Sequence, residues 1–241
     1  MKKLLVLLLF IPLVSFGQEY LPKSQGELVK HKYITLSYNE NHEQAEWVHY
    51  NLNSNMIINN IERTEDFRSD PKVSSGSASK SDYYKSGYDK GHLAPAADMK
   101  ISRTSMSESF YLSNISPQDS SFNLGGWKKL ENLVRAWAEN SSLYITTAGI
   151  LEDNLKTIGK NNVSVPDKFY KIIFNPTKQR MIAFLIPNSK IFNSLSTYVV
   201  SVNKIEELTG IDFYSELEDK LEEHLESKAS IEGWNFDSVE Y

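Results

Sequence analysis

Apolar and polar positions alternate in several short stretches of the chain, and this pattern predicts strands. The stretches 33–38 and 45–52 combine alternation with β-branched and aromatic residues. Three later runs are rich in apolar β-formers, and each is followed by a turn signal such as Asn175-Pro176. These later runs are 143–148, 169–174 and 181–186, and a further strand is expected at 197–202.

Apolar residues elsewhere recur at helical spacing. In the segment 124–139 the apolar residues that share one helical face are Trp127, Leu130, Val134 and Trp137. A short helix is expected at 204–208, ended by Gly210. Leucines at every fourth position in 215–228 predict an amphipathic helix with a charged outer face, followed by an acidic tail to residue 241. We find no internal repeat and no Pro/Gly-rich linker, so the order of elements predicts one α+β domain with a mixed or antiparallel sheet.

The first 17 residues have the layout of a cleaved secretory signal peptide. Lys2 and Lys3 precede an apolar run at 4–14, and small residues stand before a cut at Gln18. The run is shorter than the ~20 residues that span a bilayer, although an uncleaved anchor is the alternative. We therefore expect a mature domain of residues 18–241 that is secreted or periplasmic, with no stable membrane insertion after cleavage.

Composition excludes several classes of protein. Apolar residues make up 40% of the 241 residues and aromatic residues 12%, which is too much for a disordered chain. The absence of cysteine excludes a disulfide framework, a thiolate nucleophile and a cysteine-based zinc site. The formal net charge is −5, but the stretch 204–241 contains 12 acidic and 3 basic residues. The rest of the mature chain is therefore weakly basic and can face an anionic substrate.

The side chains that could take part in catalysis or metal binding lie in the segments 88–98 and 111–131. His92 follows a glycine that lets a ligand approach the backbone, although a lone histidine in a turn is more often structural. Asn123 stands just before the predicted helix, where asparagine is usually an N-cap. Glu131 lies eight residues further on, on nearly the same helical face, and Arg135 could simply pair with it at i+4. Each residue taken singly therefore has a structural explanation.

Taken together, the segments resemble the DNA/RNA non-specific endonuclease family. The family signature D-R-G-H, followed by A-P and a nearby Asp, corresponds to Asp89-Lys90-Gly91-His92, Pro95 and Asp98. Its second block corresponds to Asn114-Ile115-Ser116-Pro117-Gln118, then Asn123, Trp127 and Leu130-Glu131. An upstream block corresponds to Arg63, Phe67, Asp70 and Pro71. The resemblance covers roughly residues 33–214, and several blocks in the right order make it specific.

The resemblance implies a ββα-metal fold, in which two strands and a helix present the active site on a larger sheet. It implies that His92 is the general base, because an imidazole suits proton transfer at neutral pH. Asn123 would be the sole direct protein ligand of Mg²⁺, with water filling the other positions, and Mn²⁺ or another divalent cation could substitute. Such a cation acts as a Lewis acid on the phosphate.

The remaining site residues follow from the same resemblance. Glu131 would hold waters around the metal, and Asn114 would orient the site. Arg63 and Arg135 would clamp the phosphate through charge-assisted hydrogen bonds. Lys90 stands where the family usually has Arg, and it keeps the charge but loses the planar fork. We therefore expect activity to be retained, with weaker binding of the phosphate than an arginine would give.

The expected substrates are DNA and RNA, without sequence preference, because the sequence shows no separate base-reading module. Basic residues gather around the motifs with a local net charge of about +2, so we expect weak and salt-sensitive binding. These basic residues are Lys80, Lys85, Lys90, Lys100, Arg103, Lys128, Lys129 and Arg135. Two alternatives remain open: a phosphodiesterase acting on small nucleotides, and a catalytically impaired protein that binds nucleic acid.

Overall fold

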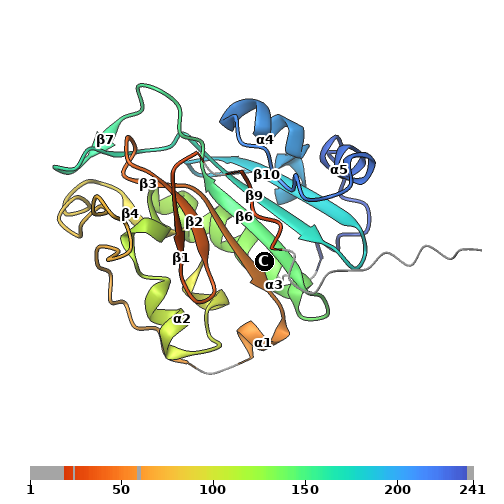
Figure 1. Ribbon diagram of the computed structural model, residues 1–241, viewed down its shortest axis with the longest axis horizontal. Helices are drawn as coiled ribbons and strands as arrows, with labels where there is room; N and C mark the ends of the chain where they lie inside the picture. Colours follow the sequence, from red (N-terminus) through yellow and green to blue (C-terminus); the bar gives the residue numbers. More distant parts are fainter. Residues whose placement is uncertain (1–18, 24, 59–60, 238–241) are drawn as a thin grey trace, which may run out of the picture.

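The computed structural model of the protein describes residues 19–23, 25–58 and 61–237, and its centre is a sheet of seven antiparallel strands. The strand order is β1-β2-β3-β6-β9-β10-β11 (Figure 1). The strands are β1 (Glu27–Lys30), β2 (Thr35–Asn39), β3 (Gln44–Leu52), β6 (Leu143–Gly149), β9 (Lys168–Asn175), β10 (Arg180–Pro187) and β11 (Val199–Val200). Five of the predicted strands are confirmed, with ends that shift by a few residues, and so is the α+β class.

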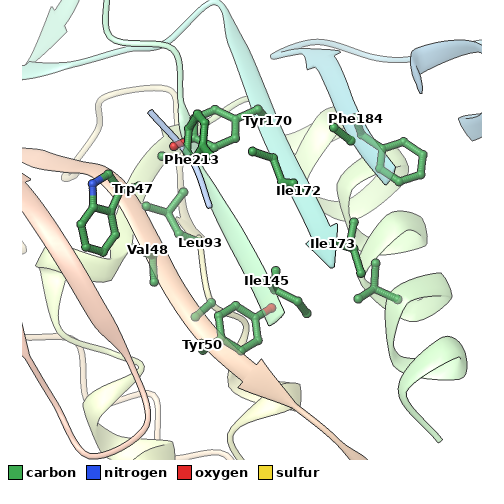
Figure 2. Close-up of a cluster of buried hydrophobic side chains, with 14 of the residues drawn as sticks. Trp47, Val48, Tyr50, Leu93, Ile145, Tyr170, Ile172, Ile173, Phe184 and Phe213 are labelled. Carbon is green, nitrogen blue, oxygen red and sulfur yellow. The ribbon is translucent and has the colours of Figure 1, made fainter. Parts of the chain in front are cut away.

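Both faces of the sheet are covered, as the alternating side chains of β9 show. Phe169 packs on Trp127 of the long helix on one face, with ring centroids 5.7 Å apart. The next residue, Tyr170, points to the opposite face and packs on Phe213, with ring centroids 5.6 Å apart. Figure 2 shows the buried side chains that gather around the central strands. Because apolar area is removed from water on both faces, this strand is apolar almost throughout.

The long helix starts earlier than predicted and contains a wide turn. A π-helical segment at Phe122–Trp127 runs directly into α3 (Lys128–Ala138). Asp119 caps the start, because its Oδ1 accepts hydrogen bonds from the Ser121 N–H at 2.8 Å and the Phe122 N–H at 3.3 Å. Asn123 therefore lies inside the first turns, and its interpretation as the N-cap is wrong. π-turns within helices are frequent at functional sites.

A hairpin outside the main sheet lies beside this helix. It is formed by β4 (Asp89–His92) and β5 (Ile115–Gln118), which pair antiparallel. The segment between them contains α2 (Arg103–Glu108) and short 3₁₀ turns at Ala96–Asp98 and Leu112–Asn114. The hairpin and the helix together are the two strands and helix that the ββα-metal fold requires. Other short elements are α1 (Ser54–Ile57), β7 (Thr157–Ile158) and β8 (Val163–Ser164).

Two C-terminal predictions need correction. The expected strand at 197–202 is a 3₁₀ turn, Leu195–Tyr198, followed by the two residues of β11. Its predicted end is helical because the Ser201 side chain accepts the Lys204 N–H at 3.2 Å and starts α4 (Val202–Thr209). Gly210 ends α4 with φ 68°, as predicted. The amphipathic helix is shorter than 215–228, because Glu218 caps α5 (Asp219–Glu226).

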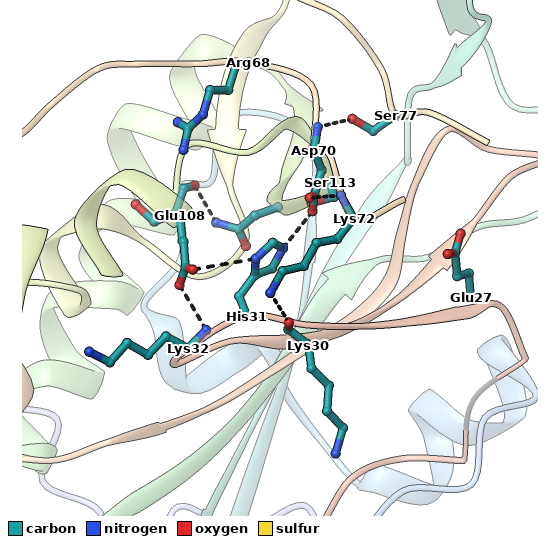
Figure 3. Close-up of polar contacts among 12 residues, drawn as sticks. Glu27, Lys30, His31, Lys32, Arg68, Asp70, Lys72, Ser77, Glu108 and Ser113 are labelled. Atoms are coloured by element: carbon teal, nitrogen blue, oxygen red, sulfur yellow. Dashed lines mark hydrogen bonds and ion pairs between the residues drawn. The ribbon is translucent and has the colours of Figure 1, made fainter. Parts of the chain in front are cut away.

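A buried polar network attaches the N-terminal hairpin to the segment that carries the upstream motif. Asp70 accepts a hydrogen bond from His31 Nε2 at 2.7 Å and another from Ser113 Oγ at 2.5 Å (Figure 3). Its other oxygen accepts the Lys72 N–H at 2.9 Å. Asp70 is 2% exposed, so its charge is stabilised by these donors rather than by water. The motif residue Asp70 thus has a structural role and fixes the chain next to Asn114.

The predicted signal peptide at 1–17 lies outside the described residues. Among the residues that the structure describes, no helix is long and apolar enough to cross a membrane.

Candidate active site

His92 ends β4 in a pocket formed by two phenylalanines. Its ring centroid lies 4.8 Å from that of Phe110 and 5.5 Å from that of Phe67. The side chain is buried, and Nε2 has no hydrogen-bond partner within the described ranges. Burial, and the nearby positive charge of Arg63, lower the pKa of His92 to about 3. The imidazole is therefore neutral at physiological pH, and the same shift makes it a weaker base than a solvated histidine.

Asn123 is held by the first residue of the same strand. Its Nδ2 donates a 2.9 Å hydrogen bond to Oδ2 of Asp89, while Oδ1 of Asp89 accepts a 2.7 Å bond from Ser120 Oγ. A carboxylate only accepts hydrogen bonds, so this contact fixes which way the Asn123 amide is turned. The carbonyl oxygen of Asn123 therefore points away from Asp89. Asp89 makes these contacts rather than an ion pair with Lys90.

The charged residues of α3 meet a buried lysine from the sheet. Lys171 of β9 is 1% exposed, and its Nζ donates to the Leu93 carbonyl at 3.4 Å. The same Nζ lies 4.7 Å from the centroid of the Trp127 ring. Burial raises the pKa of Glu131 and lowers that of Lys171, and the charge of each opposes the shift of the other. Lys171 is a residue of the site that the sequence interpretation missed, because a single lysine in an apolar strand gives no motif.

Arg135 does not form the simple pair with Glu131 that its i+4 spacing allows. Its ion pair is with Asp98 of the first motif, at 2.7 Å, and it also bonds to Asn132. Asp98 in turn accepts a 2.9 Å bond from the hydroxyl of Tyr50 on β3. The arrangement joins the helix, the segment after His92 and the central sheet, and it leaves the Arg135 side chain 19% exposed.

The two other predicted cations lie over the rings that enclose His92. Arg63 is half exposed, and its Cζ lies 4.9 Å from the centroid of Phe110. Lys90 Nζ lies 5.1 Å from the centroid of Phe67. The positive charge of Arg63 adds to the lowering of the His92 pKa and opposes the rise that burial causes in the Glu131 pKa. Its charge therefore acts on both halves of the site. Both cations are placed where they can reach an anion beside the imidazole.

Asn114 and Gln118 shape the chain around His92. The Asn114 amide bonds to both the N–H and the carbonyl of Ala94, each at 2.9 Å, so it holds the segment after His92. Nδ2 also donates to the Ser109 carbonyl at 2.8 Å, so both N–H donors of the amide are engaged. Gln118 is fully buried against Gly91, where any Cβ would lie 2.1 Å from its side chain. The glycine of the motif therefore leaves the space that the buried Gln118 side chain fills.

The donor set fits a hard divalent cation bound through few protein ligands. Within the described part of the chain no group of three or more histidine, aspartate or glutamate side chains forms a metal cluster. The Asn123 carbonyl oxygen, turned outward by Asp89, is the kind of ligand that Mg²⁺ accepts while keeping most of its waters. Glu131 offers a carboxylate from the same helix.

A two-stranded hairpin and a helix that present a histidine and an asparagine next to a large antiparallel sheet have the arrangement of the ββα-metal nucleases. The family model for DNA/RNA non-specific endonucleases matches residues 15–220. The mitochondrial nuclease EXOG of Danio rerio is 36% identical over 222 residues, which cover 84% of this chain and 65% of that protein. A nuclease of Nostoc sp. is 35% identical over 218 residues, which cover 83% of this chain and 77% of that protein.

A solved structure agrees with these relatives. The EndoG/EndoGI complex contains a chain that matches with a TM-score of 0.74 and 28% identity, covering 81% of this chain and 89% of that one. The chain therefore belongs to the DNA/RNA non-specific endonuclease family, a family of metal-dependent nucleases. It matches just under two thirds of the length of the EXOG of Danio rerio, and 59% of that of Mus musculus.

Proposed function

We propose that the protein is a Mg²⁺-dependent endonuclease that hydrolyses phosphodiester bonds of DNA and RNA without sequence preference. The observation that carries the proposal is the Asp89–Asn123 hydrogen bond, because it sets an amide oxygen free for a metal beside a neutral, buried His92. Membership of the family supports the same activity.

Each site residue has its own role in the proposed hydrolysis of the phosphodiester bond. His92 accepts the proton of the attacking water, since its nitrogen is uncharged at neutral pH. Arg63 and Lys90 provide positive charge beside the imidazole, where the phosphate develops negative charge. Asn123 would hold the Mg²⁺, with Glu131 orienting its waters, and the ion would supply Lewis-acid stabilisation of the leaving 3′ oxygen.

The proposed contacts of Arg63 and Lys90 with phosphate are the basis for broad specificity. Contacts made mainly to phosphate oxygens carry little sequence information. The charged network of Lys171, Asp98 and Arg135 joins the long helix to the central sheet and to the segment after His92.

The test is digestion of supercoiled plasmid and of total RNA by purified residues 18–241, with Mg²⁺ and with EDTA. We expect both substrates to be cut with Mg²⁺ and neither with EDTA. Cleavage of a dinucleotide but not of plasmid would indicate a small-nucleotide phosphodiesterase instead. DNA binding without cleavage under any divalent ion would indicate a catalytically impaired binding protein.

We also propose that the protein is exported by a cleaved signal peptide, on the residue pattern of 1–17. N-terminal sequencing of the protein recovered from the periplasm or the medium should begin at Gln18. Recovery of the intact N-terminus from the membrane fraction would contradict this.

A further inference from the structure

A groove beside the helix that carries Asn123 has features that the catalytic residues do not use. It has a volume of about 380 Å³ and lies between the first turns of the helix and the loop that joins β10 to β11. On the helix side it is lined by Ser121, Gly125 and Lys129, which are four residues apart and share one face. Asn123 lies on the turn between the first two, so the groove borders the proposed metal site across the width of one helix, ~10–12 Å.

The loop side of the groove is held firmly in place. Asn188 accepts the Asp119 N–H at 2.8 Å, and its amide nitrogen donates to the Pro117 carbonyl at 3.1 Å. These bonds attach the start of the loop to the end of β5 and to the helix cap. Further along, Ile191 packs so closely on Gly126 that a Cβ there would lie 2.5 Å from it. Hydrogen bonds and side-chain packing therefore fix the loop wall of the groove relative to the helix.

The lining combines an exposed aromatic ring with positive charge. Phe192 is 84% exposed, the most exposed of the large apolar side chains in the described part of the chain. Lys190 Nζ lies 5.3 Å from the centroid of its ring, and Lys129 stands on the opposite wall. Asp119, at the start of the helix, accepts the N–H groups of Ser121 and Phe122. At Gly125 no atom lies within 4 Å of where a Cβ would be, so the floor is open.

We propose that this groove binds one nucleotide of the substrate strand on the far side of the helix from the scissile phosphate, with its base stacked on Phe192 and its phosphate between Lys190 and Lys129. The proposal rests on the nuclease function proposed above and specifies its substrate class. An exposed ring flanked by lysines is the combination that binds single-stranded nucleic acid, since every base has a π-face. A base in a duplex must first lose its pairing and stacking, at a cost in free energy, before it can reach Phe192, so single strands bind more tightly than duplex of the same sequence.

The experiment measures base stacking directly and without cleavage. Single-stranded 8-mers that carry 2-aminopurine at successive positions are titrated in EDTA into the wild-type protein and the variants Phe192→Ala, Phe192→Trp and Lys190→Ala. We expect fluorescence quenching at one or two adjacent positions, lost in Phe192→Ala with at least fivefold weaker binding, and retained in Phe192→Trp. Lys190→Ala should reduce the slope of log K against log salt by about one.

Matched controls and a small substrate keep the outcomes separate. Leu28→Ala and Lys228→Ala change an exposed apolar and a basic residue far from the groove, and both should bind like the wild type. Phe192→Ala should cleave thymidine 5′-(4-nitrophenyl) phosphate normally, because that ester occupies only the catalytic site. If the wild type cleaves neither this ester nor plasmid, the proposed function fails, while the quenching result still decides the groove.

Two results would overturn the groove assignment. One is quenching that is the same in Phe192→Ala as in the wild type. The other is a change of sedimentation coefficient in Phe192→Ala with unaltered oligonucleotide binding, which would identify the groove as a protein–protein interface.

Discussion

Asp89 and Asn123 are joined by a 2.9 Å hydrogen bond from the amide nitrogen of Asn123 to a carboxylate oxygen of Asp89. One residue begins the strand that ends in His92, and the other lies in the π-turn at the start of the long helix. The bond therefore sets both the spacing of strand and helix and the direction of the asparagine oxygen. Groups that orient a metal ligand are worth tenfold to a hundredfold in metal affinity.

Asp89→Ala should raise the Mg²⁺ concentration needed for half-maximal activity by about tenfold to a hundredfold, because the Asn123 amide is then free to rotate. Titration of cleavage rate with Mg²⁺ measures this. Ser120→Ala removes the other side-chain partner of Asp89 and should change the half-maximal concentration less than threefold. An unchanged Mg²⁺ requirement in Asp89→Ala would show that the bond does not orient the ligand.

Lys171→Met should move the acidic limb of the pH–rate profile to higher pH. Burial raises the pKa of Glu131, and the positive charge of Lys171 opposes that rise. Without the charge, the pKa of Glu131 rises further and its ionised form is lost at a higher pH. Measurement of kcat/KM from pH 5 to 9 tests this, and a uniform drop with no shift of the limb would assign Lys171 a purely structural role.

Gly91→Ala should destabilise the protein by about 1–3 kcal/mol, because the new Cβ overlaps the buried Gln118 side chain. Gln118→Ala opens that space, so the double variant should recover most of the loss. The free energies of unfolding of the wild type, the two single variants and the double variant, from thermal or denaturant unfolding, form a double-mutant cycle. Additive losses in the double variant would mean that the contact between Gly91 and Gln118 is not the cause.

Glu226→Gln should stabilise the protein at alkaline pH. Glu226 is 4% exposed, and burial together with acidic neighbours, Glu206 first, raises its pKa to about 9. Between the unfolded pKa near 4.5 and the folded value, the unfolded state releases a proton that the folded state keeps, so stability falls as pH rises. We expect a gain that vanishes near pH 5 and grows with pH to at most about 5 kcal/mol at pH 8, measured by denaturant unfolding.

Local pattern was sufficient for five of the seven strands of the main sheet and for the helix ended by Gly210, because alternation and turn residues act over a few positions. The start of the long helix was misplaced, since Asp119 and Asn123 are both good caps and only tertiary contacts decide between them. The bond from Asp89 to Asn123 spans 34 residues and is invisible to local pattern. Lys171 was missed for the same reason, because its partners come from other elements.

The most direct test of the account is the single-turnover cleavage rate of plasmid by His92→Ala at saturating Mg²⁺, with and without added imidazole. We expect a loss of at least about a thousandfold, partly restored by imidazole at pH values where imidazole is unprotonated. The acidic limb of the wild-type profile should follow the protonation of Glu131 rather than of His92, because burial raises the pKa of Glu131 to about 7 and lowers that of His92 to about 3. A variant rate within tenfold of the wild type would contradict the assignment of His92 as the general base.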